Sequence, residues 1–266
     1  MRFTSIPIPS RRFLNYWHCG GGTGGKMAAE ATKDRRKIVL ANWKAHLSPA
    51  QAEKWTADFV RLYLPTSIQV ILAVPDIVLP AVHALTRDLE NVSLAAQDVS
   101  PFPPGGYTGA TPAAWLQGLA GYVLIGHRER RRYFHETAQD AANKISEAAA
   151  AGLRPILCLP GTDITGHLAP VDSADLERLI LAYTPDDAEA LEVARNRESV
   201  AAAVRQLAEA AGGRPVLYGG GVKADNVADI ITIHGLAGVM TAGGSLRPSG
   251  FISLLNNADR ALAAGS

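Results

Sequence analysis

Two side chains suited to electrostatic or acid–base catalysis stand directly after short apolar runs of the sequence. Lys44 follows the run Ile38–Asn42, and His127 lies just after the run Tyr122–Ile125. In parallel α/β proteins, functional residues lie just past the carboxyl ends of the strands. An ammonium there can neutralise a phosphate or a developing oxyanion, and a histidine at a helix start stays neutral and can donate a hydrogen bond to a carbonyl or enediolate oxygen. Taken singly, such residues are more often a surface lysine and a structural histidine.

Two glycine-rich segments follow the last two of eight short apolar runs. Gly220 and Gly221 come after the seventh run, and Gly243 and Gly244 come after the eighth. Their backbone N–H groups can approach a ligand with no side chain in the way, which suits a phosphate. One such loop is weak support, but two of them after strands 7 and 8 of a barrel predict a phosphate site.

These residues are positioned by an alternation of apolar and amphipathic segments. Short apolar runs bounded by turn residues predict buried strands, and alanine-rich stretches with helical spacing lie between most of them. The eight predicted strands are Ile38–Asn42, Val70–Val74, Val92–Ala96, Tyr122–Ile125, Pro155–Leu159, Leu179–Tyr183, Val216–Tyr218 and Gly238–Thr241. This alternation predicts a parallel α/β fold, and the 266 residues suffice for one domain of eight βα units, which needs about 250. Periodicity alone leaves a closed barrel and an open doubly wound sheet as alternatives.

Helix starts are predicted where a capping residue stands before a proline. Ser48 is followed by a proline and, three residues after the serine, by a glutamine, a combination typical of a helix N-terminus. Thr111-Pro112 predicts a second start of the same kind. The alanine-rich stretches Ala138–Ala151 and Glu198–Ala211 predict long helices that end near glycine.

The connection after the fifth strand departs from this rhythm. It contains several glycines, prolines and aspartates. Only Ser173–Arg178 could be helical, which amounts to about two turns at most. We therefore predict a shortened fifth crossover helix.

Composition excludes several classes of protein. Apolar residues make up 47% and charged residues 19% of the chain, and 26 basic residues nearly balance 25 acidic ones, for a net charge of +1. This mixture excludes a disordered chain, and no global field draws the protein to nucleic acid or to an acidic membrane. The sequence contains no run of 18 apolar residues, so no membrane span is predicted. Cys19 and Cys158 are far apart, so neither a disulfide framework nor a metal site is expected, no cofactor is implied, and the cytoplasm is the predicted compartment.

Residues 1–36 differ from the rest of the chain. They combine arginines and aromatic residues with the glycine cluster Gly20–Gly25, and they lack the unbroken apolar core of a secretory signal. We interpret them as a flexible tail, or as the result of a start codon assigned too early, with Met27 as the true start. An organelle transit peptide is the alternative. Residues 37–266 are then predicted to form a single domain.

Beyond these patterns, the chain resembles the triosephosphate isomerase family over roughly residues 37–260. The resemblance implies a (β/α)8 TIM barrel and an aldose–ketose isomerase of glyceraldehyde 3-phosphate and dihydroxyacetone phosphate, or of a longer sugar phosphate, in glycolysis and gluconeogenesis. It rests on motifs in matching order and spacing, namely Asn42-Trp43-Lys44, Ala96-Gln97-Asp98, Tyr107-Thr108-Gly109, Ile125–Arg131, Cys158, Ala182-Tyr183, Tyr218–Gly221 and Ala242–Leu246.

The resemblance also implies roles for the candidate residues, taken from the family. Lys44 stabilises the oxyanion electrostatically, and His127 polarises the carbonyl as a neutral electrophile. Asn42 helps to orient the substrate, and Glu129 is a partner of Lys44. The loops that contain Gly220–Gly221 and Gly243–Gly244 hold the phosphate of the small phosphorylated sugar.

The family usually dimerises through the loop after its third strand, which enters the site of the neighbouring subunit. In this chain that loop is Ser100–Gly109. Its prolines stiffen it, and Phe102 and Tyr107 are predicted anchors of a homodimer. The alternative is that this aromatic pair packs on its own barrel.

The resemblance fails at the position of the general base. The family has a glutamate directly after strand 6, and this chain has Thr184, whose hydroxyl cannot take a carbon-bound proton near neutral pH because its alkoxide is too high in energy. The family's glycine-hinged lid is replaced by Asp186–Leu191, which is typical of the first turn of a helix. The alternative is that Asp186 or Asp187 has taken over as the base, although a displacement of about 1 Å can cost on the order of a hundredfold in rate.

Further departures lie at or near the site. Arg128 and Gly221 each stand where the family usually has a serine, and the serine at the second position meets the phosphate. Ala242 replaces a glycine, and Pro160-Gly161 replaces Gly-Glu after strand 5. These changes favour an impaired or altered activity.

Three interpretations stay open. The first is an isomerase that has recruited Asp186 or Asp187. The second is a catalytically inactive paralogue that binds a sugar phosphate or has a regulatory role, and the third is a barrel that serves mainly assembly. We take the first as the main hypothesis, because Lys44 and His127 are retained without an obvious structural need.

Overall fold

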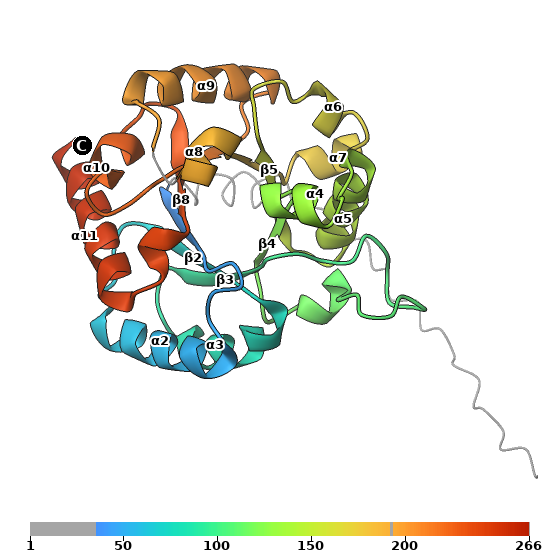
Figure 1. The fold of residues 1–266 in the computed structure, drawn as a ribbon, viewed down its shortest axis with the longest axis horizontal. Coiled ribbons are helices and arrows are strands. Elements are labelled where there is room, and N and C mark those ends of the chain that lie inside the picture. The colour runs from blue at the N-terminus through green and yellow to red at the C-terminus, as the bar shows by residue number, and fades with distance from the viewer. Residues whose placement is uncertain (1–35, 192–193, 266) are drawn as a thin grey trace, which may run out of the picture. The chain divides into compact units, whose positions relative to one another are not determined.

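Eight parallel strands close into a barrel (Figure 1). The computed structural model describes residues 36–191 and 194–265. Each strand pairs with the next one along the chain, and β8 pairs with β1. The strands are β1 (Ile38–Asn42), β2 (Gln69–Val74), β3 (Val92–Ala96), β4 (Tyr122–Ile125), β5 (Arg154–Leu159), β6 (Ile180–Tyr183), β7 (Val216–Tyr218) and β8 (Leu236–Thr241). The closed barrel therefore replaces the open sheet as the architecture, and the predicted (β/α)8 fold is confirmed.

The strands are largely apolar because most of their residues are buried on both faces of the sheet. One set of alternate residues, which includes Leu40, Ile71 and Leu124, fills the interior of the barrel. The residues between them, such as Val39 and Val70, pack outwards in a larger core shared with the helices. The carboxyl ends of all eight strands consequently meet at one rim of the barrel.

The helices surround the strands (Figure 1). They are α2 (Pro49–Leu62), α3 (Leu79–Thr86), α4 (Arg128–Tyr133), α5 (Ala138–Ala150), α6 (Thr165–Leu168), α7 (Ser173–Leu176), α8 (Asp186–Leu191), α9 (Arg197–Ala210), α10 (Val227–Ile231) and α11 (Pro248–Ala264), with 3-10 turns η1 (Asp76–Val78), η2 (Ala113–Leu116) and η3 (Gly243–Ser245). Ser48 caps α2 in a reciprocal capping box, as predicted. The predicted helices at α5 and α9 are confirmed to within one residue.

The helix predicted at Thr111-Pro112 is wrong in extent. Only the single 3-10 turn η2 forms there, and no side chain caps it. Gln117 after it has extended backbone, and Gly118 has a φ of 79°, a left-handed conformation that ends the turn.

The fifth crossover helix is short, as predicted. Two helices of four residues each, α6 and α7, take its place between β5 and β6. The sequence pattern indicated the second of these and missed the first. Asp172 caps α7 through its side chain, and a proline stands between the two helices, which prevents their fusion.

The tail predicted at residues 1–36 falls almost wholly outside the described residues, so it stays a prediction. Within the described part of the chain, no helix is both long and apolar enough to span a membrane.

Candidate functional site

The predicted binding residues from four strand ends come together around one cavity. Asn42 and Lys44 follow β1, His127 follows β4, and the two glycine loops follow β7 and β8. The described residues that line the cavity are Asn42, Lys44, His127, Gly219, Gly220, Gly221, Val222, Lys223, Met240, Thr241, Ala242, Gly243 and Gly244. None of them carries a carboxylate.

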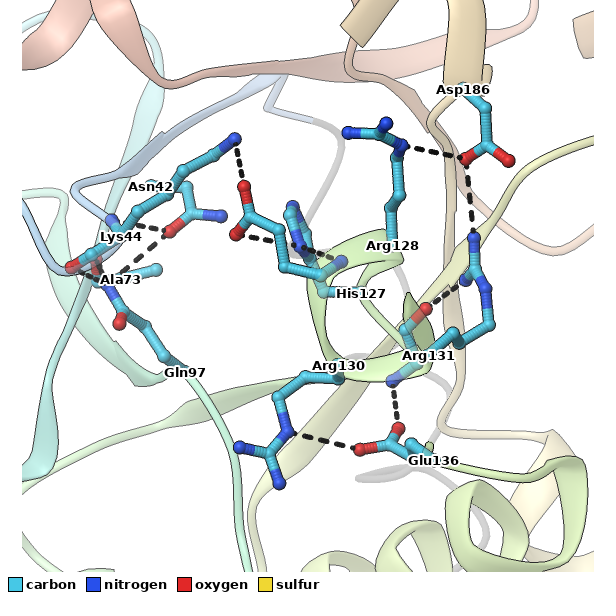
Figure 2. Close-up of polar contacts among 12 residues, drawn as sticks. Asn42, Lys44, Ala73, Gln97, His127, Arg128, Arg130, Arg131, Glu136 and Asp186 are labelled. Carbon is cyan, nitrogen blue, oxygen red and sulfur yellow. Dashed lines mark hydrogen bonds and ion pairs between the residues drawn. The ribbon is translucent and has the colours of Figure 1, made fainter. Parts of the chain in front are cut away.

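Lys44 is held in a strained backbone conformation at the start of the β1 loop. Its φ is 50°, in the left-handed region that non-glycine residues rarely adopt. Its N–H donates to Asn42 Oδ1 over 3.0 Å, and Gln97 Nε2 donates to its carbonyl oxygen over 3.0 Å (Figure 2). Strain of this kind costs on the order of 1–3 kcal/mol and persists where surrounding contacts fix it, often at functional sites.

Glu129 links Lys44 to His127. The Lys44 Nζ lies 2.7 Å from Glu129 Oε1, in a pair that is only partly exposed. The backbone N–H of Glu129 donates to His127 Nδ1 over 3.3 Å, so that His127 caps α4 with its own ring. With Nδ1 as acceptor, the neutral ring carries its proton on Nε2. Glu129 Oε2 lies 3.4 Å from Nδ1, a contact that becomes an ion pair only when the ring is protonated.

A buried charge cluster fixes the backbone that carries His127. Glu136 accepts a hydrogen bond from the N–H of Gly126 over 2.8 Å, and Lys144 Nζ contacts both Glu136 and Asp98. Arg130 completes the cluster with a 2.7 Å contact to Asp98 (Figure 2 shows the Arg130–Glu136 pair). Burial raises the pKa of Asp98, and the Lys144 and Arg130 charges oppose that shift.

The two glycine loops are glycine-rich for reasons of packing as well as for ligand access. A Cβ on Gly220 would lie 2.7 Å from Tyr218 Oη, and one on Gly244 would lie 2.7 Å from Thr241 Oγ1. The same Thr241 hydroxyl donates to the carbonyl of Val222 over 2.7 Å and so ties the loops together. Gly221 has a φ of 57°. The wall of the cavity formed by these loops is therefore built largely of backbone, an arrangement that can bind an anion.

Thr184 is fully buried and does not line this cavity. Its backbone N–H donates to the carbonyl of Leu159 over 2.8 Å, and its hydroxyl donates to the same oxygen over 3.3 Å. The hydroxyl at the position of the family's base is thus engaged with the backbone of β5.

The two candidate replacement bases begin α8 and pair with arginines. Asp186 Oδ1 lies 3.6 Å from Arg128 Nε and 3.7 Å from an Arg131 nitrogen (Figure 2). Asp187 makes two contacts of 2.8 and 2.9 Å with Arg195 Nη2. The hydrogen bond from Arg195 lowers the pKa of Asp187, which makes that carboxylate a weaker base. The predicted helix start is confirmed, and neither aspartate lines the cavity.

Two residues that shape the site were not singled out in the sequence, and a third was quoted in a motif without a role. Lys223 lines the cavity, and Arg195 holds the first turn of α8 through Asp187. Gln97, of the Ala96-Gln97-Asp98 motif, holds the Lys44 loop. The positions of Gln97 and Lys223 shortly after the third and seventh strands were available signals. Arg195 had none, because its contacts depend on the fold.

The Ser100–Gly109 loop carries its aromatic pair at the surface. Phe102 and Tyr107 stack at 4.5 Å between ring centroids and are 42% and 43% exposed. They pack on each other, which leaves both available to a partner. A second cavity lies at the other side of Lys44 and His127, and its lining includes Asp76, Glu129 and the exposed Phe134.

Comparisons with known proteins give one family. The family model described as triosephosphate isomerase matches residues 37–258. A triosephosphate isomerase from Thermus thermophilus is 32% identical over 256 residues, which cover 83% of this chain and 98% of the relative. One from Xanthomonas euvesicatoria is 35% identical over 251 residues, with 83% and 97% covered, and one from Nitratidesulfovibrio vulgaris is 32% identical over 248 residues, with 83% and 99% covered.

Proposed function

The chain belongs to the triosephosphate isomerase family, and from this premise we propose that it is an aldose–ketose isomerase of a small sugar phosphate. Glyceraldehyde 3-phosphate and dihydroxyacetone phosphate, or a longer analogue, are the proposed substrates, with no cofactor. One observation carries the proposal. Lys44 and His127, linked through Glu129, line the same cavity as the two glycine loops.

The residues of the cavity divide the work of such a reaction. We assign the phosphoryl group to the backbone at Gly220, Gly221, Gly243 and Gly244. The carbonyl oxygen then faces Lys44 and His127, whose ammonium and Nε2–H stabilise the negative charge of the enediolate. Asn42 orients the substrate, and Glu129 positions Lys44 and the His127 ring.

The proton-transfer step is the one for which this chain provides the fewest suitable residues. Thr184 supplies no base, and Asp186 and Asp187, the candidate substitutes, are paired with arginines. General-base catalysis contributes on the order of 10²–10⁴-fold. With no carboxylate among the described residues that line the cavity, solvent water or hydroxide takes the carbon-bound proton and a water molecule returns one to the neighbouring carbon. We therefore expect turnover slower than in family members that carry the glutamate.

Exchange of the substrate's carbon-bound hydrogen in D₂O tests the proposal. We expect slow incorporation of deuterium into dihydroxyacetone phosphate, measured as a mass increase of the substrate by mass spectrometry. His127→Gln should abolish it, whereas His46→Gln, a change at a histidine of the β1 loop outside the cavity lining, should not. Binding of the substrate without exchange would exclude the isomerase.

Two observations favour a second candidate function, a sugar-phosphate-binding or regulatory protein with no catalysis. The Thr184 hydroxyl is engaged with a backbone carbonyl, and no described side chain that lines the cavity is acidic. A binding protein needs the phosphate loops and Lys44 but no base. The exchange experiment separates it from the isomerase, because only the isomerase labels the substrate.

We also propose a homodimer formed through Ser100–Gly109, with cytoplasmic location. The exposed Phe102–Tyr107 stack would enter the second cavity, beside Asp76 and Phe134, of a neighbouring copy. Phe102→Ser should then shift the protein to a monomer in analytical ultracentrifugation. A wild-type protein that sediments as a monomer would exclude this partner.

A further inference from the structure

We propose that Arg128 forms a subsite for a second anionic group, so that the cavity prefers ligands with an oxyanion at each end. The ligand class is a phosphoryl compound that carries a carboxylate or a second phosphoryl group at its far end. This proposal rests on the proposed function, in which the glycine loops bind a phosphoryl group. It adds which chemical group of the ligand is preferred at the opposite, carbonyl end of the site.

Arg128 is a shielded arginine with few partners of its own. It is the first residue of α4, directly after His127, and its side chain is 18% exposed. Its contact within the described part of the chain is the 3.6 Å approach of Nε to Asp186 Oδ1. In Figure 2 the side chain rises beside His127, with Nε turned towards Asp186 and the terminal nitrogens turned towards the side of Lys44. These nitrogens make no hydrogen bond to the residues that the structure describes.

The neighbouring arginines show the contrast. Arg131 approaches the same Asp186 oxygen, but it also donates to the carbonyls of Gly126 and Cys158. Arg130 pairs with Asp98 and stacks over the ring of Phe134. Arg128 therefore keeps the donors that a guanidinium offers in a planar fork, which matches a carboxylate or phosphoryl group bidentately.

The charge balance around Arg128 is positive. Arg128 and Arg131 share one carboxylate, Asp186, whose side chain is 59% exposed and so well screened by solvent. Lys44 is paired with Glu129, so the surplus charge at this end of the site belongs to the arginines. At the glycine-loop end, Lys223 lines the cavity, with no acidic residue among its described lining. Arg128 lies beside this lining, next to His127, and is not part of it, so the second anionic group would extend past His127 towards Arg128.

Calorimetric titration at constant ionic strength tests the subsite with three probes of similar length. Glycerol 3-phosphate ends in a hydroxyl, 3-phosphoglycerate in a carboxylate, and 1,3-propanediol bisphosphate in a phosphoryl group. We expect one or both of the doubly anionic probes to bind about tenfold more tightly than glycerol 3-phosphate, because a charge-assisted bidentate contact is added. Which of the two gains more identifies the second oxyanion.

Arg128→Gln should remove this advantage and leave the affinity for glycerol 3-phosphate within about twofold. Arg132→Gln is the matched control, since Arg132 lies exposed on the same helix against Tyr133 and loses the same charge. Asp186→Asn should act in the opposite direction and tighten the doubly anionic probes about threefold, because it removes the competing carboxylate.

The outcomes separate this proposal from the proposed isomerase. Equal affinities for all three probes, or equal losses with Arg128→Gln and Arg132→Gln, would overturn the subsite. If the wild-type protein binds none of the three probes, both proposals are overturned. An Arg128-dependent preference without deuterium exchange would uphold the subsite and exclude the isomerase.

Discussion

The two sides of the barrel rim are built differently. On the carbonyl side, formed by Asn42, Lys44, Gln97, His127 and Glu129, side chains hold one another through short contacts, such as the 2.7 Å pair of Lys44 and Glu129. On the base side, formed by Thr184 and α8, a hydroxyl bonds to the backbone, and an exposed aspartate approaches two arginines at 3.6 and 3.7 Å. The first arrangement is pre-organised for one chemical task, and the second is typical of ion pairs that hold a helix in place.

The contrast teaches that loss of a base need not loosen the rest of a site. The contacts of the carbonyl side described above join the segments that follow β1, β3 and β4, whereas Thr184 bonds to Leu159 of β5. Position 184 can therefore change without disturbing Lys44 or His127. Electrophilic stabilisation and proton abstraction are structurally separable in this barrel, which makes each side open to its own test.

The largest expected effect comes from restoring a base. Thr184→Glu places a carboxylate at a fully buried position, two residues before the Asp186 that Arg128 approaches, so a second variant removes Arg128 to keep it from pairing with the new carboxylate and weakening it as a base. We expect Thr184→Glu to raise isomerase turnover, and Thr184→Glu with Arg128→Ser to raise it further, on the order of 10²–10⁴-fold in total. The α8 segment does not exclude water as a lid does, so family-level rates are not expected.

Matched controls keep this prediction testable. Thr184→Gln with Arg128→Ser has nearly the same shape and no base, and it should show no gain. Thermal melts establish that each variant folds. A folded Thr184→Glu variant that binds glycerol 3-phosphate and gains no activity would show that the lid and the phosphate loops, rather than the base alone, disable the site, and would favour the binding protein.

The second effect breaks the carbonyl side. Lys44→Met keeps the stem of the side chain and removes the ammonium, which leaves the developing oxyanion without its cation. We expect proton exchange to fall on the order of 10²–10³-fold, the usual cost of removing one oxyanion-stabilising group. Lys54→Met, at an exposed lysine of α2 paired with Asp58, is the control. Similar losses in the two variants would mean that Lys44 does not contact the reacting atoms.

How much of this could be predicted from sequence depends on the range of the contacts. The strands and the first turns of α2 and α8 follow from local patterns, so residues such as Ser48 and Asp186 could be assigned to their elements. The absence of a base at position 184 could likewise be predicted from the sequence, because it depends on the identity of a single residue. The helix expected at Thr111 failed, since the conformation of Gly118 decides where that turn ends.

Contacts between distant segments could not be predicted. The arginines of the run Arg128–Arg131 are visible in the sequence, and in the structure they pair with carboxylates and a carbonyl. Their partners, however, lie at Asp98, Asp186 and the carbonyl of Cys158, which are brought close only by the barrel. The same holds for the Thr184 hydroxyl, which meets Leu159 because β5 and β6 are neighbours.

The third effect concerns the phosphate loops shared by both sides. Gly221→Ser supplies a hydroxyl and should tighten glycerol 3-phosphate by about 1 kcal/mol, or roughly fivefold, for one added hydrogen bond. The φ of 57° at this position also imposes a cost of about 1–2 kcal/mol on the folded state of a serine variant. Tighter binding in calorimetry together with a lower melting temperature is therefore expected. Unchanged or weaker binding would mean that the phosphoryl group does not sit beside Gly221.

The smallest expected effect comes from the carboxylates of the base side. Asp186→Asn and Asp187→Asn preserve the shape and the helix start, and they remove the two candidate substitute bases. Asp187 is a weak base because the Arg195 hydrogen bond lowers its pKa, and Asp186 lies against two guanidinium groups outside the cavity lining. We expect less than a twofold change in exchange rate for each variant, a change close to the error of the assay. A loss on the order of a hundredfold in either one would identify that aspartate as the base. Such a result would also erase the contrast between the two sides, because α8 would then have to move its carboxylate into the cavity during turnover.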